Sequence, residues 1–279
     1  MAGFVGVPSL IQSRHGRRGN FELVVARAEG GLSHYWRDND APRFPWHGPT
    51  AFADDLGLVD AVCLIQSNLG DSGRLEMVAK LGDQLAHLWR DPQPPFQWHG
   101  PEFFASGSSA APGFIQSRYG TTGNFEVVTA TFGEGRGLNH YWRDNDDPSF
   151  PWHASARLGD SLPFLGSGMT LIQSNYGNPG RLEVVTDLWG PEGNNSLLHL
   201  WRDAVAPLQW HSETSFGQHV TGNPALVQSR FGTRGNFEVV APRPTAALPI
   251  IGATMTTRPS PGTAQPSSAS SLARSRRYR

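Results

Sequence analysis

Short stretches in which apolar and polar residues alternate are the most regular feature of this chain. In one of them Phe21, Leu23 and Val25 share one side of an extended backbone, and Glu22 and Val24 lie on the other. Gly, Asn, Asp and Pro separate such stretches, and tight turns require these residue types. No stretch of useful length has the 3.6-residue period of an amphipathic helix. The pattern therefore predicts an all-β protein.

Two phrases recur along the chain at nearly constant spacing. The first joins Ile-Gln-Ser or a close variant to Gly-Asn-Phe-Glu or Gly-Arg-Leu-Glu, and its glutamines are Gln12, Gln66, Gln116, Gln173 and Gln228. The second is His-x-Trp-Arg-Asp, which begins at His34, His87, His140 and His199. The Gln-Ser-Arg and Gln-Ser-Asn forms of the first phrase alternate, which suggests that a block of two units was duplicated.

Each repeat contains about four extended segments, which in the third repeat are residues 113–117, 124–129, 138–143 and 152–156. Four strands in about 50 residues are typical of a β-propeller blade, in which radial stacking protects the sheet edges. We therefore predict an all-β propeller of four-stranded blades, with repeats that start near residues 10, 64, 114 and 171. A partial fifth repeat starts near residue 226.

The fifth repeat shows only two predicted strands before the repeat pattern ends. Residues 248–257 or those before Ser9 could complete a fifth blade, or the chain could be part of a larger propeller. We predict a propeller domain at residues 1–242 and a disordered tail at residues 243–279, because Pro, Ser, Ala, Thr and Gly dominate residues 259–271.

Charge and composition exclude several classes of protein. The tail has six Arg and no acidic residue, so a total net charge of -1 leaves the remainder at -7, which argues against nucleic acid as a partner. No segment is apolar over the roughly 18 residues that a membrane helix needs, so no membrane insertion is expected. The first residues lack the pattern of a signal peptide, and the compartment stays open. Cys63 is the single cysteine, which excludes an internal disulfide framework.

The recurrent His-x-Trp-Arg-Asp phrase places His34, Trp36 and Asp38 on one face of a strand. This could be a His–Asp acid/base pair, but catalysis would not need the same set in every blade. A structural role is therefore favoured, in which buried polar groups satisfy one another. The natural partners of the recurrent arginines are Glu22, Glu76, Glu126, Glu183 and Glu238.

Metal and enzyme chemistry receive little support. Residues 38–40 and 144–147 are rich in Asp and Asn, as a Ca²⁺ loop would be, but the equivalent residues 91–94 and 203–206 are not. Turns capped by Asp and Asn explain both versions. No zinc, phosphate-loop or nucleophile-elbow motif occurs, so we expect no metal, no cofactor and no catalytic residues.

Trp-His pairs close each full repeat after a Pro-rich turn, and this position predicts a loop rim. An indole face beside a hydrogen-bonding group suits a sugar ring. The candidate glycan-binding residues are Trp46, His47, Trp98, His99, Trp152, His153, Trp210 and His211. The alternative, that these tryptophans only pack between blades, stays equally open.

The phrases Gly-Asn-Phe-Glu-Val-Val, His-Tyr-Trp-Arg-Asp and Pro-Trp-His resemble those of propeller lectins over about residues 10–241. The similar groups are the tachylectins and tectonins and the bacterial PLL-type fucose-binding lectins. The resemblance implies a propeller of five to seven blades, glycan sites between blades or at their rims, no cofactor, and a role in recognition or defence.

Three functions follow, in order of preference. The first is a multivalent carbohydrate-binding lectin without catalysis, whose partners are glycans or glycoconjugates. The second is a propeller that serves as a protein-interaction scaffold, and the third is a propeller-type glycoside-acting enzyme, which would need carboxylates that converge in one pocket. The identity of the sugar and homo-oligomerisation are left open.

Overall fold

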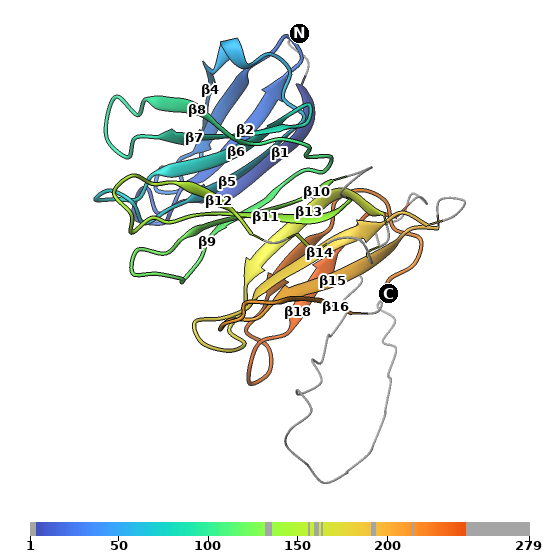
Figure 1. Ribbon diagram of the computed structural model, residues 1–279. Coiled ribbons are helices and arrows are strands. Elements are labelled where there is room, and N and C mark those ends of the chain that lie inside the picture. The colour runs from blue at the N-terminus through green and yellow to red at the C-terminus, as the bar shows by residue number, and fades with distance from the viewer. Residues whose placement is uncertain are drawn as a thin grey trace, which may run out of the picture.

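The computed structural model describes residues 4–131, 136–155, 157–158, 162, 164–190, 194–213 and 215–243. Within these residues the chain is all-β, as predicted, and the single helical element is the short 3-10 helix η1, Asp54–Leu56 (Figure 1). No helix among them is long and apolar enough to span a membrane. The predicted tail, apart from Arg243, lies outside the described residues.

The strands form four units of four strands and a fifth unit of two. Unit 1 consists of β1 (Phe4–Gln12), β2 (Phe21–Arg27), β3 (Leu32–Arg37) and β4 (Trp46–Phe52). Unit 2 consists of β5 (Ala61–Gln66), β6 (Leu75–Leu81), β7 (Gln84–Arg90) and β8 (Trp98–Ala105). Unit 3 consists of β9 (Gly113–Gln116), β10 (Phe125–Thr131), β11 (Gly137–Arg143) and β12 (Trp152–Ala154). Unit 4 consists of β13 (Leu165–Gln173), β14 (Leu182–Leu188), β15 (Ser196–Arg202) and β16 (Trp210–Ser212), and unit 5 of β17 (Ala225–Gln228) and β18 (Phe237–Val240).

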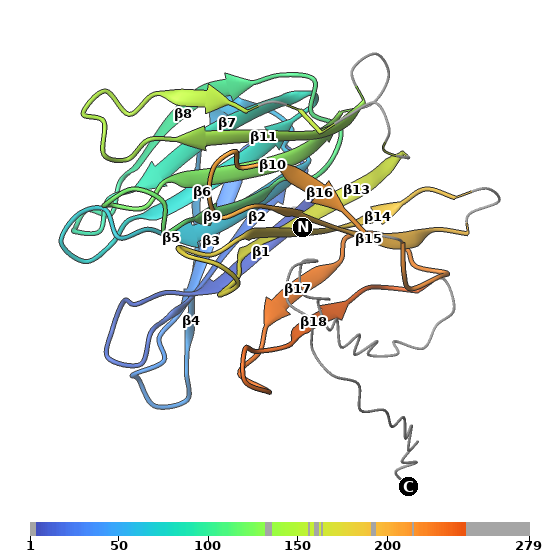
Figure 2. The same ribbon diagram turned by 60° about the horizontal axis from the view of Figure 1, so that its bottom comes forward.

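Each unit is an antiparallel sheet whose strands pair in chain order. Consecutive units meet at their first strands: β1 pairs in parallel with β5 through Val7 and Ala61, and a parallel bridge joins Ala111 to Gly168. Figure 2 shows the sheets of units 1 to 4 side by side in chain order, with β17 and β18 next to unit 4. The predicted strands of the third repeat are thus confirmed, each within about two residues.

The pairing of the first and last units bears on closure of a ring. Among the described residues β17 pairs with β18, whereas β1 pairs with β2 and β5. Closure therefore stays a prediction.

Burial of the second strands shows which units are covered on both faces. Strand β2 alternates between buried and half-buried residues, while β6, β10 and β14 are buried almost throughout. Side chains of a strand point to both faces of its sheet, so continuous burial requires a neighbour on each face. Units 2, 3 and 4 therefore lie between two neighbours.

The hydrophobic cores lie between units rather than within them. One core joins Val24 and Leu32 of unit 1 to Met77 of unit 2, and another joins Val128 of unit 3 to Val184 of unit 4. Two further clusters join unit 2 to unit 3 and unit 4 to unit 5. This arrangement is typical of repeat proteins, in which each unit buries its faces against its neighbours.

Candidate functional site

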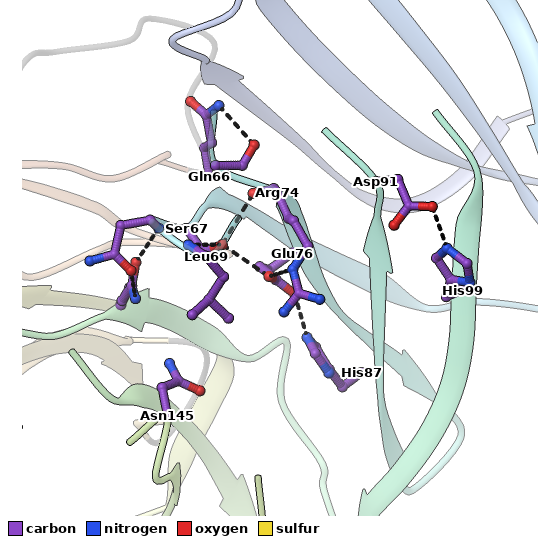
Figure 3. Close-up of polar contacts among 12 residues, drawn as sticks. Gln66, Ser67, Leu69, Arg74, Glu76, His87, Asp91, His99 and Asn145 are labelled. Carbon is purple, nitrogen blue, oxygen red and sulfur yellow. Dashed lines mark hydrogen bonds and ion pairs between the residues drawn. The ribbon is translucent and has the colours of Figure 1, made fainter. Parts of the chain in front are cut away.

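A buried carboxylate recurs near the middle of each of units 1 to 4. In unit 2, Glu76 accepts hydrogen bonds from Ser67 Oγ at 2.9 Å and from His87 Nε2 at 3.0 Å (Figure 3). Strand register explains the contact, because Val78 pairs with His87 and therefore places the imidazole on the same face as Glu76. The equivalent triads are Ser13–Glu22–His34, Ser117–Glu126–His140 and Ser174–Glu183–His199.

Arginines connect these triads to the next unit. Arg143 Nη1 of unit 3 lies 3.0 Å from His87 Nδ1 of unit 2. A guanidinium can only donate, so Nδ1 accepts and the proton of the neutral imidazole lies on Nε2, where it is donated to Glu76. The corresponding pairs are Arg90 with His34 and Arg202 with His140, each at 3.4 Å.

The sequence predicted that the recurrent glutamates would pair with arginines, and that the first His and the Asp of His-x-Trp-Arg-Asp would satisfy each other. In the described residues the His stands between Glu and the Arg of His-x-Trp-Arg-Asp. Of these arginines only Arg202 also approaches a carboxylate of this set, at 3.6 Å from Glu126, while Arg74 of the first phrase lies 3.1 Å from Glu76. Asp91 and Asp203 instead accept from the later histidines His99 and His211, at 2.7 and 2.8 Å. The histidine is therefore a structural link, as favoured, but with a different partner.

Burial and charge set the protonation of these groups. Burial alone would raise the pKa of Glu22, but the hydrogen bond from His34 and the charge of Arg90 lower it below the ordinary value. Burial lowers the pKa of His140 and outweighs the opposing effect of Glu126. Glu22 is thus ionised and His140 neutral near pH 7.

The predicted Trp-His residues lie at the boundaries between units. Trp98, Trp152 and Trp210 each lie edge-on to the buried histidine of the preceding unit, at ring-centroid distances of 6.0, 5.7 and 5.6 Å. Trp98 also stacks on Phe52 of unit 1 at 4.2 Å. Trp46 of unit 1 differs, because 48% of it is exposed.

The four histidines of these pairs stack on the tryptophan of the neighbouring strand. His47 stacks on Trp36 at 4.1 Å and His153 on Trp142 at 4.4 Å. The other pairs are His99 on Trp89 and His211 on Trp201. Each of these indoles therefore stacks on an imidazole, and Trp89 and Trp201 also stack on His87 and His199 of their own strands.

A groove opens between units 3 and 4. It is a cavity of about 640 Å³, and its walls include Asn124, Glu126 and Trp142 from unit 3 and Arg202 and Trp210 from unit 4. Trp210, one of the predicted residues, thus lines the groove. Its exposed fraction is only 8%.

The same repeat positions form a groove between units 1 and 2. That cavity measures about 410 Å³ and is lined by Asn20, Glu22 and Trp36 of unit 1 and by Arg90 and Phe96 of unit 2. The predicted residues Trp98 and His99 line a separate cavity of about 360 Å³ near strand β4. Sites of similar composition therefore recur along the chain.

Two buried polar atoms at the larger groove lack hydrogen-bond partners among the described residues. They are the acceptor Asn124 Oδ1 and the donor Trp210 Nε1. Buried polar atoms are normally paired. Trp152 Nε1 at the boundary between units 2 and 3 also lacks a partner among the described residues, so the feature is shared by both boundaries. Sequence analysis did not single out Asn124, although its recurrence in Gly-Asn-Phe-Glu was a visible signal.

The acidic turns cap backbone amides. Asp146 accepts from the amides of Thr121 and Thr122, and Asp40 accepts from those of Arg17 and Arg18. The described residues contain no cluster of three or more His, Cys, Asp or Glu placed to hold a metal ion. The interpretation of these stretches as capped turns agrees with the contacts.

No family model and no curated protein matches the chain, but solved structures do. A mutant of AofleA from Arthrobotrys oligospora, with three arginines replaced by alanine, matches at a TM-score of 0.58 and 11% identity. The match covers 85% of this chain and 65% of that chain, so the chain spans about two thirds of AofleA.

The fucose-specific lectin from Aleuria aurantia matches at a TM-score of 0.56 and 17% identity, over 86% of this chain and 73% of that chain. A family 43 arabinoxylan arabinofuranohydrolase from Bacillus subtilis matches at a TM-score of 0.49 and 12% identity, over 84% of this chain and 58% of the enzyme. The chain thus shares the fold of propeller lectins.

Proposed function

We propose that this chain is a multivalent carbohydrate-binding lectin without catalytic activity, and that it binds sugars in the grooves between its units. The observation that carries the proposal is the recurrence of one groove composition at two unit boundaries. Each groove combines an indole with an amide, a guanidinium and a buried carboxylate. We also propose that the units belong to a closed ring of propeller blades.

The groove between units 3 and 4 offers the contacts that a sugar needs. The C–H face of a pyranose packs on an indole such as Trp142, and its hydroxyls need donors and acceptors at fixed places. The side-chain amide of Asn124 and the guanidinium of Arg202 both line the groove and would bind these hydroxyls. A half-open groove of this kind binds weakly, so several grooves on one surface would raise apparent affinity by about 10²–10⁴.

The shared fold supports this proposal, since the Aleuria aurantia protein of the same fold is described as fucose-specific. A neutral sugar such as fucose would suit the groove between units 1 and 2, where Glu22 and Arg90 offset each other's charge.

Absence of catalysis follows from the way in which the carboxylates are held. Glu126 accepts from Ser117 and His140 and is almost fully buried, and the same triad recurs in four units. A glycosidase needs two carboxylates that face one bond, one of which can exchange a proton. A carboxylate fixed in a repeated structural triad does not meet that need.

The predicted Trp-His rims stay part of the proposal as additional glycan contacts outside the two grooves, apart from Trp210, which lines one of them. Trp46 is the informative residue, because its exposure allows replacement without loss of core. If it contacts glycan, Trp46→Ala will weaken binding to a glycan surface while the melting temperature is unchanged.

A glycan array with the full chain tests the proposal. We expect binding to a defined set of neutral glycans, and reduced binding by Asn124→Ala. Asn236→Ala is the matched control, because Asn236 occupies the same phrase in unit 5, where no third strand is present among the described residues. Failure of the parent to bind any glycan, or equal losses in both variants, would contradict the proposal.

A further inference from the structure

Two positions of the repeat alternate between neutral and charged residues. The residue after the glycine of the first phrase is Asn in units 1 and 3 and Arg in units 2 and 4, namely Asn20, Asn124, Arg74 and Arg181. The residue beside the buried histidine on the fourth strand is Thr or Ser in units 1 and 3 and Glu in units 2 and 4. These residues are Thr50, Ser155, Glu102 and Glu213.

The neutral residues border open grooves. Asn20 lines the groove between units 1 and 2, and Asn124 and Ser155 line the groove between units 3 and 4. Ser155 Oγ lies 2.8 Å from His140 Nδ1, so this short side chain stays close to the wall. The indoles of Trp36 and Trp142 face these grooves.

The charged residues crowd the boundary between units 2 and 3. Arg74 Nε lies 3.1 Å from Glu76 Oε1 (Figure 3). The Arg74 guanidinium carbon lies 6.0 Å from the ring centroid of Trp89. Glu102, also of unit 2, has its Oε2 at 3.2 Å from Nη1 of Arg143, which comes from unit 3. The indole of Trp89, which is equivalent to Trp36 and Trp142, therefore has a guanidinium near its ring.

Displacing these side chains would be costly. Glu76 is fully buried, so a sugar that moved Arg74 aside would remove a charged partner from a carboxylate that water cannot reach. A sugar hydroxyl cannot replace a guanidinium, because it carries no charge. Glu22 of unit 1 has the same Ser and His donors as Glu76, so the two units differ in the presence of Arg74.

We propose that only the grooves with neutral residues bind sugar, and that Arg74 and Glu102 exclude sugar from the boundary between units 2 and 3. This inference rests on the proposed function and specifies its sites. Arg181 and Glu213 give unit 4 the same exclusion on its side toward unit 5. Units 1 to 4 then carry two sites for an uncharged pyranose rather than three.

The tryptophans provide a direct readout, because each groove has its own indole. The full chain is labelled with 5-fluorotryptophan, its nine tryptophan signals are assigned with Trp→Phe variants, and methyl α-L-fucopyranoside is added in ¹⁹F NMR titrations. We expect the signals of Trp36 and Trp142 to shift with saturation and that of Trp89 to stay unchanged.

A gain-of-binding variant completes the test. Arg74→Asn with Glu102→Ser gives unit 2 the residues that unit 3 carries at both positions, and Glu76 keeps Ser67 and His87. The Trp89 signal should then shift with the others, and undisturbed signals of the remaining tryptophans show that the variant is folded.

Three results would overturn the inference. They are a shift of Trp89 in the parent, an unchanged Trp89 signal in the folded double variant, and no shift of Trp36 or Trp142 in a parent that binds glycans on the array. The last result would leave the proposed function intact and place its sites elsewhere. A parent that binds no glycan on the array would overturn the function and this inference together.

Discussion

Arg143 Nη1 lies 3.0 Å from His87 Nδ1 across the boundary between units 2 and 3. Because His87 also binds Glu76, one imidazole joins a buried carboxylate of one unit to a cation of the next. A hydrogen-bonded series of this kind fixes how far apart and at what angle neighbouring units stand. Groove shape therefore depends on these links between units.

The contribution of this link can be measured by comparing two histidines. His199 has the same bond to its glutamate, but its Nδ1 lacks a hydrogen-bond partner among the described residues. His87→Leu removes the partner of both Glu76 and Arg143 and should lower the free energy of unfolding by about 3 kcal/mol. The loss in His199→Leu should be smaller than this by about 1 kcal/mol. Urea unfolding of both variants checks this, and equal losses would show that the contact with arginine adds nothing.

Replacing a triad carboxylate should also be costly. Glu126→Ala leaves Ser117 and His140 without their buried acceptor, which should destabilise the fold by about 1–3 kcal/mol. Glu238→Ala in unit 5 is the control, because Glu238 is only partly buried. The melting temperature is measured for both, and a Glu126 variant that melts like the parent would refute the structural role of the triads.

Stability should depend on pH in a direction fixed by these groups. The folded-state pKa of His140 lies below its ordinary 6.5 and that of Glu22 below 4.5, so in both cases the unfolded chain binds the proton more readily. Stability is then fully present above about pH 6.5, decreases as the pH falls below it, and decreases further below about pH 4.5.

Urea midpoints measured from pH 8 to pH 4 report this profile. His140→Gln should flatten the first decrease, because it removes a group whose pKa is lower in the folded chain than in the unfolded chain. A midpoint that rises as the pH falls from 7 to 5 would have the wrong sign for a buried neutral imidazole.

Residues beyond Arg243 lie outside the described residues, and the domain boundary near residue 242 stays a prediction. Among the described residues, the cores that join each unit to the next extend along the chain to Ala241. A chain that ends at Arg243 should therefore keep the melting temperature and glycan binding of the full chain. A lower melting temperature would show that the removed residues complete unit 5.

The sequence predicted the strands well because the repeat gave the same signal several times. Gly-Asn-Phe-Glu-Val-Val and His-x-Trp-Arg-Asp alternate by twos and are bounded by turn residues, so β10 and β11 could be located within about two residues. The partner of Glu126 could not be located in this way. It depends on the register of β10 against β11 and on the arginine of another unit, and spacing along one chain does not give either.

The same limit applies to the sites. Alternation between Asn and Arg after the glycine was visible in the sequence, but its consequence appears only when Arg74 is seen beside Trp89. The Trp-His pairs were correctly placed next to turns, yet Trp210 is nearly covered because unit 3 packs against it. Exposure of an aromatic residue in a repeat protein depends on its neighbours, which a single repeat does not reveal.

The most direct test of groove binding is a crystal structure of the chain soaked with methyl α-L-fucopyranoside. The account predicts a pyranose between units 3 and 4, with its ring over Trp142 and hydroxyls within hydrogen-bond distance of the Asn124 amide and the Arg202 guanidinium. Density for the sugar at the exposed rim alone, around Trp46, with the groove unchanged, would contradict it.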